Sequence, residues 1–435
     1  MHLIYENLLK NLILLWTDEF KGLDEGSGCY TLSKAVWEAV GQATAASGST
    51  IPSAFGARPP NIASDRSNFT AENYSFWALY IGPILLRNKF RDRKYYDHFV
   101  DLIVLLNICL QFELTVYDVE TIRTGFVHWV QKFEDLYYQH DPARISACPL
   151  TIHAILHIAE SILAAGPVWA YWAFPMERYC ATLLPAIKSR RFPFASIDKF
   201  VTDTAQLTHI KHIYNARDEL TLTRIPGPMQ GEFRSPGYPT CALLPPRKLE
   251  ALSTAIMSKI AIALATRFNV SVNVARRHLP DEIFQYGKVR RIDGGDTMSA
   301  SEITKSSVDR RDASYVRYEM LVDKNTNKRS REPEFRLETY YGQLKRIFVV
   351  KLEATPDLPD TPTILFMAAI TNCIIDSRNK LDMHFYSRQG RTEVVDITCI
   401  QCLVGRIRYD NQWAIIDRSG SLARALHSDD DNDEA

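Results

Sequence analysis

The sequence lacks the short motifs that identify common enzyme classes. It contains no Gly-rich phosphate loop, no nucleophile elbow and no dinucleotide-binding fingerprint. It also lacks an excess of either charge, because 51 Lys and Arg residues balance 51 Asp and Glu residues over 435 positions. Zero net charge excludes a uniformly basic nucleic-acid binder, although local basic patches remain compatible with it.

Signals for export and for membrane insertion are lacking as well. No secretory signal opens the chain, and its eight scattered cysteines are typical of reduced thiols in an intracellular protein. The longest apolar run, around Phe99 to Leu110, is too short for a membrane span and contains Asp101 and Asn107. We therefore expect a soluble intracellular protein without a membrane partner.

Helical periodicity dominates the first half of the chain. Apolar residues recur at three and four positions over residues 1–20, over three stretches within 71–138 and over 196–220. Thr70 has the residue type and position of a helix N-cap. Residues 226–246 are dense in Pro and Gly and predict a linker before a helix at 247–268. Residues 276–336 are charged and weakly periodic, which is typical either of a phosphate-binding arm or of a solvated, partly disordered connector.

The last hundred residues change to a period of two. Short runs of β-branched and aromatic residues, separated by turns such as Arg388–Gly390 and Asp410–Asn411, predict a small antiparallel β barrel. The fold class is therefore α+β and multidomain, mainly α in the first half with a C-terminal antiparallel β module. The predicted regions are 1–222 (helical), 223–335 (linker, one helix and charged connector), 336–420 (β module) and 421–435 (acidic disordered tail).

Two histidines, His153 and His157, lie four residues apart on one predicted helix face. Imidazoles at that spacing can share a metal ion, and Cys148 and Cys180 would complete a zinc site. The zinc-protease motif needs Glu directly after the first His, where this chain has Ala154. Structural histidines without a metal are the alternative, and we favour that interpretation.

Cys399 and Cys402 form a single CxxC within a predicted strand, and no second pair accompanies it. Residues three apart on a strand face opposite sides, so core thiols are the preferred interpretation. The alternative makes the β module a chromatin or peptide reader, which an aromatic cage lined by Tyr340, Tyr341 and Trp413 would support.

Glu177 follows Pro175 at the start of a predicted helix. Acidic residues are favoured there by the helix dipole alone, so its position does not distinguish a structural role from a catalytic one. A basic cluster, Lys188, Arg190 and Arg191, follows this helix, and further basic pairs such as Arg310 and Arg311 lie downstream. These five side chains are the candidate contacts to a DNA backbone.

Three segments carry a family resemblance: PLTIHAILHIAESI, GPVWAYWAFPMERYC and SRRFPFASIDKFV. Together with upstream sequence, residues 1–220 resemble the C-terminal part of the catalytic region of CACTA-type (En/Spm-like) DNA transposases of the fungal kind. The resemblance implies an RNase H-like fold whose Asp, Asp, Glu triad holds two Mg²⁺ or Mn²⁺ ions for DNA strand cleavage and transfer. The MERY segment matches the family's Glu context, so the resemblance assigns the third carboxylate to Glu177.

The same resemblance places both aspartates upstream of the Met1–His2 pair. What remains is the family's helical insertion and its last catalytic helix, which would lack the sheet on which it packs. We therefore expect a truncated transposase copy that is inactive alone, located in the nucleus, with transposon-end DNA and a second copy or a partner transposase as its partners. The alternative is a domesticated, non-catalytic DNA- or protein-binding protein.

Overall fold

The computed structural model describes residues 2–20, 23, 28–216, 219–220, 229–292, 295–304, 309–325, 332, 334–355, 361–420 and 423–424. Of the predicted acidic tail, all but residues 423–424 lie outside the described residues, as do 223–228 at the start of the predicted linker region.

Helices fill the first half of the chain, as the spacing of apolar residues predicts. They are η1 (His2–Leu8), α1 (Leu9–Trp16), α2 (Lys34–Ser47), α3 (Ala71–Phe76), η4 (Trp77–Ile81), α4 (Gly82–Leu85), α5 (Arg93–Cys109), α6 (Val116–Phe133), η5 (Glu134–Tyr138), α7 (Leu150–Ala154), η7 (Ile155–His157), α8 (Ile158–Ala165), α9 (Phe174–Leu183), η9 (Leu184–Ala186) and α10 (Pro193–Ile213). The predicted cap is confirmed, because the Thr70 hydroxyl accepts a hydrogen bond of 3.3 Å from the Asn73 N–H.

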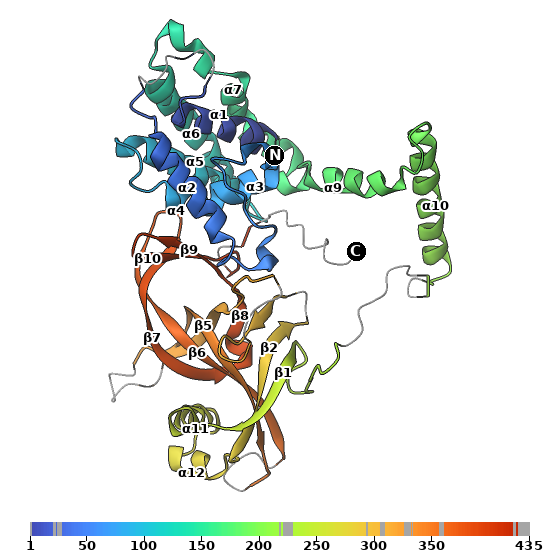
Figure 1. Ribbon diagram of the computed structural model, residues 1–435, viewed down its shortest axis with the longest axis vertical. Coiled ribbons are helices and arrows are strands. Elements are labelled where there is room, and N and C mark those ends of the chain that lie inside the picture. The colour runs from blue at the N-terminus through green and yellow to red at the C-terminus, as the bar shows by residue number, and fades with distance from the viewer. Residues whose placement is uncertain are drawn as a thin grey trace.

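The second half forms one curved antiparallel sheet that resembles half of a barrel (Figure 1). Its strands are β1 (Cys241–Ala251), β2 (Glu282–Arg291), β3 (Thr297–Ser299), β4 (Tyr315–Asp323), β5 (Phe335–Leu352), β6 (Thr363–Arg378), β7 (His384–Asp396), β8 (Ile400–Leu403), β9 (Gly405–Tyr409) and β10 (Gln412–Ile416). The order is β1-β2-β5-β6-β7-β10-β9, with β3 on β2 and with β4 between β5 and β8. An antiparallel β module is thus confirmed, although it begins well before residue 336.

The charged segment 276–336 contributes three strands to this sheet, so the prediction of a partly disordered connector is wrong, whereas DNA contact by this segment stays a prediction. Two of its arginines bind other parts of the chain. Arg290 forms an ion pair of 2.9 Å with Glu232, and Arg291 donates a hydrogen bond to the Ile400 carbonyl at 3.0 Å. The turn predicted at Arg388–Gly390 is also wrong, since these residues lie inside β7. The charged residues of these strands pair with residues far away in the sequence. The alternation typical of a strand could therefore not be recognised from the local sequence.

Two halves of the chain share one hydrophobic core. A single cluster of buried side chains runs from Trp16 and Trp77 in the helices to Phe366 and Phe385 in the sheet. A second cluster lies under α11 (Thr254–Phe268) and α12 (Val272–Arg277), where Ile260 and its neighbours pack on β5 and β6. The helical half and the sheet therefore form one continuous body.

The loop at residues 48–58 joins the two halves through polar contacts. The Thr50 carbonyl accepts the Arg406 N–H at 3.0 Å, and the Thr50 hydroxyl donates to the Arg406 carbonyl at 2.5 Å. The Arg311 guanidinium donates to the carbonyls of Gly48 (3.3 Å) and Gly56 (2.7 Å). Carbonyls outside the hydrogen bonds of helices and strands need other donors. Here Arg406 of β9 and Arg311, just before β4, supply them.

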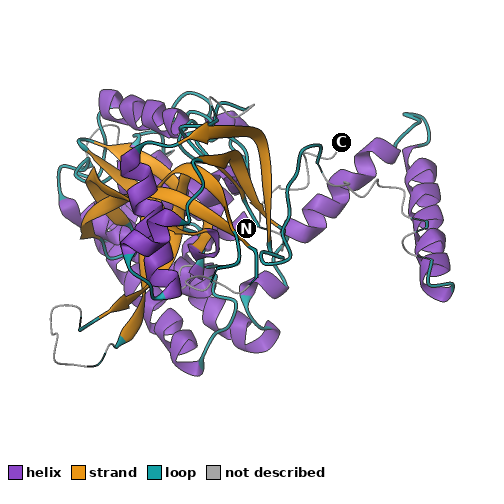
Figure 2. Cartoon of the chain, turned by 90° about the horizontal axis from the view of Figure 1, so that it is seen from below, coloured by secondary structure: helices purple, strands orange, loops and turns teal. Residues whose placement is uncertain are grey.

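The segment containing α9 and α10, which we call the arm, projects from this body. Figures 1 and 2 show from two directions that α10 stands apart from both the helical half and the sheet. Phe174 is the one buried residue of α9, and α10 has none.

The core histidine His98 gives the stability a pH dependence. Its Nε2 lies 3.1 Å from the Trp129 carbonyl, which requires the proton on Nε2, and its ring stacks on Trp129 at 4.3 Å. Burial lowers the pKa of His98 from about 6.5 to about 4. As the pH falls, His98 therefore takes up its proton at a higher pH in the unfolded chain than in the folded protein.

We predict that the stability contributed by neutral His98 is present at pH 7 and lost between pH 6.5 and 4, amounting to about 3 kcal/mol. Urea unfolding at pH 7, 5.5 and 4.5 checks this. A His98→Gln variant keeps a donor for the Trp129 carbonyl but cannot titrate, so the stability gap between wild type and variant should narrow as the pH falls. A gap that is the same at every pH would contradict the prediction.

Candidate functional site

Glu177 lies in the first turn of α9, where the arm leaves the body. Pro175 occupies one of the first two helical positions, and the Glu177 N–H donates to the Ala173 carbonyl at 3.0 Å. Proline is favoured there because the first turn needs no N–H from it. The Glu177 side chain is 50% exposed, so the carboxylate is accessible from solvent.

One partner of this carboxylate comes from the N-terminal end of the described chain. His2 Nε2 lies 3.1 Å from Glu177 Oε1, and His2 Nδ1 contacts the Glu6 carboxylate one helical turn away. The imidazole thus bridges two carboxylates. Sequence reasoning missed His2 and Glu6, although their spacing of four on a helix was a usable signal for their contact with each other.

The carboxylates of Glu6 and Glu177 contact different nitrogens of the His2 ring. Divalent ions such as Mg²⁺ need several oxygen ligands, whereas each nitrogen of His2 faces a different carboxylate, so Glu6 and Glu177 do not converge on one point. No group of three or more His, Cys, Asp or Glu residues placed to hold a metal ion is found among the residues that the structure describes.

The four predicted zinc ligands are brought together only in part. His153 Nε2 and His157 Nε2 lie 3.2 Å apart on an exposed face, so one ring nitrogen donates a hydrogen bond to the other. Cys148 packs against the main core before α7, and burial raises the pKa of its thiol. Cys180 is exposed on α9. The described part of the chain therefore presents a histidine pair and not a four-ligand zinc site.

The Cys399 and Cys402 thiols are partly buried near the end of the sheet. Burial raises the pKa of Cys402 to about 12, and its Sγ lies 2.8 Å from the Ser419 hydroxyl. Burial also raises the pKa of Cys399. Both thiols are therefore protonated near pH 7, and neither is an activated nucleophile.

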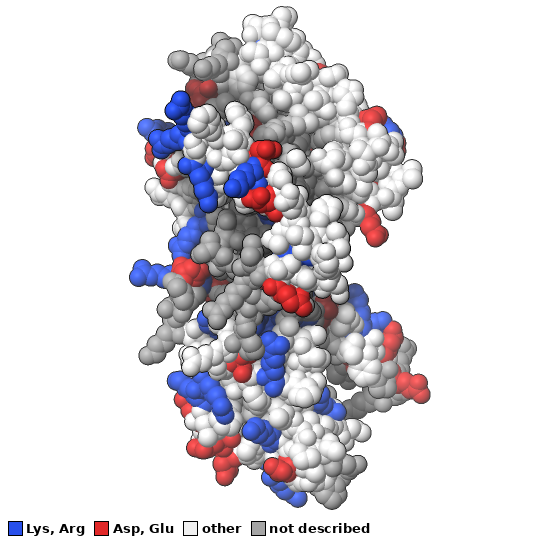
Figure 3. Space-filling model, turned by 90° about the vertical axis from the view of Figure 1, so that its right-hand side faces the viewer, with Lys and Arg blue, Asp and Glu red and all other residues white. Residues whose placement is uncertain are grey.

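The five predicted DNA contacts fall into two groups. Lys188, Arg190 and Arg191 are exposed between η9 and α10. Arg310 is also exposed, but Arg311 is 7% exposed and donates to two loop carbonyls. The assignment of Arg311 to DNA is therefore wrong, because its guanidinium is used inside the protein. Figure 3 faces the arm side of the molecule and shows Lys and Arg scattered among uncharged atoms.

The predicted aromatic cage is not available to a ligand. Tyr341 is buried and donates to Asp417 at 2.8 Å, while the neighbouring Tyr340 points to the opposite face and stacks on Tyr318. The Arg406 guanidinium lies 3.4 Å from the Tyr315 ring centre and 4.5 Å from that of Trp413. The chain's own arginine therefore occupies the aromatic site, so the prediction of an open cage is wrong.

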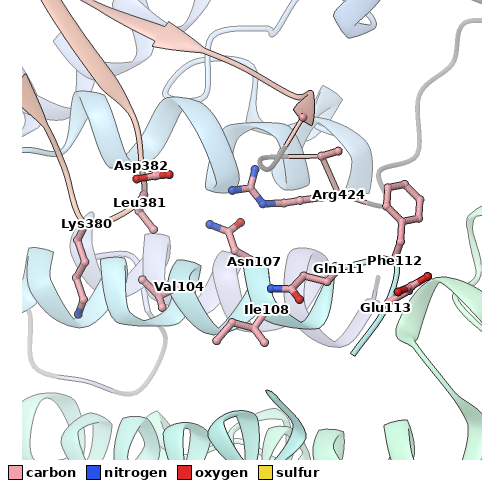
Figure 4. A pocket seen from close by; sticks show the side chains of 12 residues that line it. Val104, Asn107, Ile108, Gln111, Phe112, Glu113, Lys380, Leu381, Asp382 and Arg424 are labelled. Carbon is pink, nitrogen blue, oxygen red and sulfur yellow. The ribbon is translucent and has the colours of Figure 1, made fainter. Parts of the chain in front are cut away.

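A cavity of about 580 Å³ lies between α5 and the turn that joins β6 to β7 (Figure 4). Asn107 and Arg424 point into it, and Lys380 and Glu113 lie at its opposite ends. Charges of both signs line it, and it contains none of the predicted site residues. It presents no pairing of nucleophile and base.

Comparisons with protein-family models, with curated proteins and with solved structures find no match to this chain. Within the described residues, no single helix has the length and apolar composition of a membrane span; two successive helical stretches, 150–165 and 168–186, meet those criteria only together and are bent by 71°.

The two basic residues Arg310 and Arg311 permit a direct test of the structural assignment. We predict that Arg311→Ala lowers the free energy of unfolding by about 3 kcal/mol, because the carbonyls of Gly48 and Gly56 lose their donors. The matched variant Arg310→Ala should change it by less than about 0.5 kcal/mol. Urea unfolding monitored by circular dichroism measures both; equal effects of the two substitutions would refute the assignment.

Proposed function

We propose that the chain derives from a CACTA-type (En/Spm-like) DNA transposase, with Glu177 as the third metal-binding carboxylate of that family. The observation that carries this proposal is the apolar surface of the helix on which Glu177 lies. Met176 and Tyr179 on α9, and Leu184 just after it, are 66%, 50% and 66% exposed. Side chains of this kind are normally buried against another layer of structure.

An RNase H-like core would supply that layer. In the proposed family, the helix with the last carboxylate packs on a sheet whose strands precede this part of the sequence. A helix separated from such a sheet would show its apolar side chains to solvent, as α9 does. The sequence resemblance and the exposed face thus support the same ancestry from different observations.

The ancestral reaction is strand cleavage and transfer by two Mg²⁺ or Mn²⁺ ions held between three carboxylates. Glu177 has an imidazole within hydrogen-bonding distance and no second convergent carboxylate among the described residues. We therefore propose that this chain alone binds no catalytic ion and cuts no DNA. Its proposed partners are transposon-end DNA and a partner transposase, and its proposed location is the nucleus.

A non-catalytic DNA-binding role is the second candidate, favoured by the exposed cluster of Lys188, Arg190 and Arg191. Three cations placed next to one another on an exposed connection can contact successive phosphates. This role needs no carboxylate, so it would survive substitution of Glu177.

We predict that the purified chain with Mg²⁺ or Mn²⁺ leaves a transposon-end duplex intact, and that Glu177→Gln changes nothing in this assay. Robust cleavage that Glu177→Gln abolishes would refute the proposal of an inactive chain.

In the same preparations, fluorescence anisotropy at several salt concentrations tests the second candidate, DNA binding by the basic cluster. Replacing Lys188, Arg190 and Arg191 by Ala should lower the salt slope of log K by about 2 to 3, whereas replacing the exposed Arg276 and Arg277 of α12 should not. Equal effects of the two sets would contradict binding by the arm.

A further inference from the structure

Helix α10 has no partner within the described chain that could explain its formation. It spans 21 residues, contains no buried residue, and makes its main contact with the short η9 that precedes it. Seven of the 21 residues are β-branched, and such residues have low helix propensity. A single helix of this length and composition is marginal in water, so packing against a partner would stabilise it.

One side of α10 has the pattern of a packing surface. Ile197, Phe200, Thr204 and Leu207 follow one another at intervals of three and four residues, and Ile210 and Tyr214 continue the stripe with a small shift. Phe200 and Ile210 are 41% and 44% exposed, and Tyr214 is 74% exposed. A mainly apolar stripe of this length that faces water indicates an interaction surface.

Charges on the helix indicate which partner fits. Asp198, Lys199 and Asp203 give the first half of α10 a formal charge of −1. Lys211 gives the second half, which also contains His209 and His212, a formal charge of +1 when the histidines are neutral. Two copies of α10 in antiparallel orientation would place each acidic half beside a basic half, and a parallel pair would oppose like charges. The antiparallel arrangement is also self-complementary about a two-fold axis, as a closed dimer requires.

We propose that α10 is a dimerisation helix that packs antiparallel on the α10 of a second copy of this chain, with the Thr204–Leu207 region at the two-fold axis. The formal charge of the helix is zero when its histidines are neutral, since Lys199 and Lys211 balance Asp198 and Asp203. A helix without net positive charge is poorly suited to a phosphate backbone. The proposal concerns α10 alone and holds whether or not the chain derives from a transposase.

Sedimentation velocity of the full chain over a range of concentrations tests this dimer. We expect a monomer–dimer equilibrium that Leu207→Asp shifts to monomer, with an unchanged circular dichroism spectrum of the body. The control Leu321→Asp, at an exposed leucine on β4, should leave the equilibrium unchanged. A monomer at every concentration, or a dimer insensitive to Leu207→Asp, would overturn the proposal.

Charge reversal tests the orientation of the two helices. The double variant Asp198→Lys/Asp203→Lys should weaken dimerisation by about tenfold or more, since it brings like charges together. Adding Lys211→Glu/His212→Glu should restore it, because each half then again faces its opposite charge. A parallel pair gives a different result: the first double variant would leave the dimer essentially as strong, and that outcome would overturn the antiparallel arrangement.

Discussion

The buried guanidinium of Arg311 fixes the relation between the two halves of this protein. It lies on the sheet side of the chain and donates to carbonyls at both ends of the loop at residues 48–56 of the helical half. Burying a charged group is costly unless its donors are satisfied, and the loop provides acceptors that would otherwise be unpaired. The backbone exchange between Thr50 and Arg406 reinforces the same junction.

This junction determines what the rest of the chain can do. With the helices and the sheet held on one core, the side chains of Tyr315, Trp413 and Arg406 are used inside the protein and offer no open ligand site. The arm lies outside that arrangement. Glu177, the basic cluster after η9 and the apolar stripe of α10 are all on it, so the exposed groups with functional potential are concentrated in a segment of about forty residues.

The elements that could be predicted from sequence are those whose pattern is local. The helical spacing of α5 and α6 and the cap at Thr70 required no distant partner, and neither did the turn at Asp410–Asn411 between β9 and β10. Strands β2 and β4 were missed because their arginines gave them the composition of a solvated connector. Arg290 and Arg291 are bound by residues more than fifty positions away, which local sequence cannot reveal.

The candidate site was predictable to a similar extent. The position of Glu177 in a first helical turn follows from Pro175 and the helix that it begins. Its contact with His2, 175 residues away, depends on how the arm leaves the body and has no sequence signal. The spacing of His153 and His157 predicted two neighbouring rings, but nothing local placed Cys148 in the core or Cys180 on the exposed side of the arm.

Helices α9 and α10 form an arm outside a single body of helices and sheet. Hydrogen–deuterium exchange measured by mass spectrometry tests this arrangement most directly, since amide protection reports local opening. In dilute protein, the amides of α9 and α10 should exchange well before those of α5, α6, β5 and β6, and α10 should gain protection as the concentration rises into the range of the dimer. Protection of the arm equal to that of α5 and α6 in dilute solution would contradict the account.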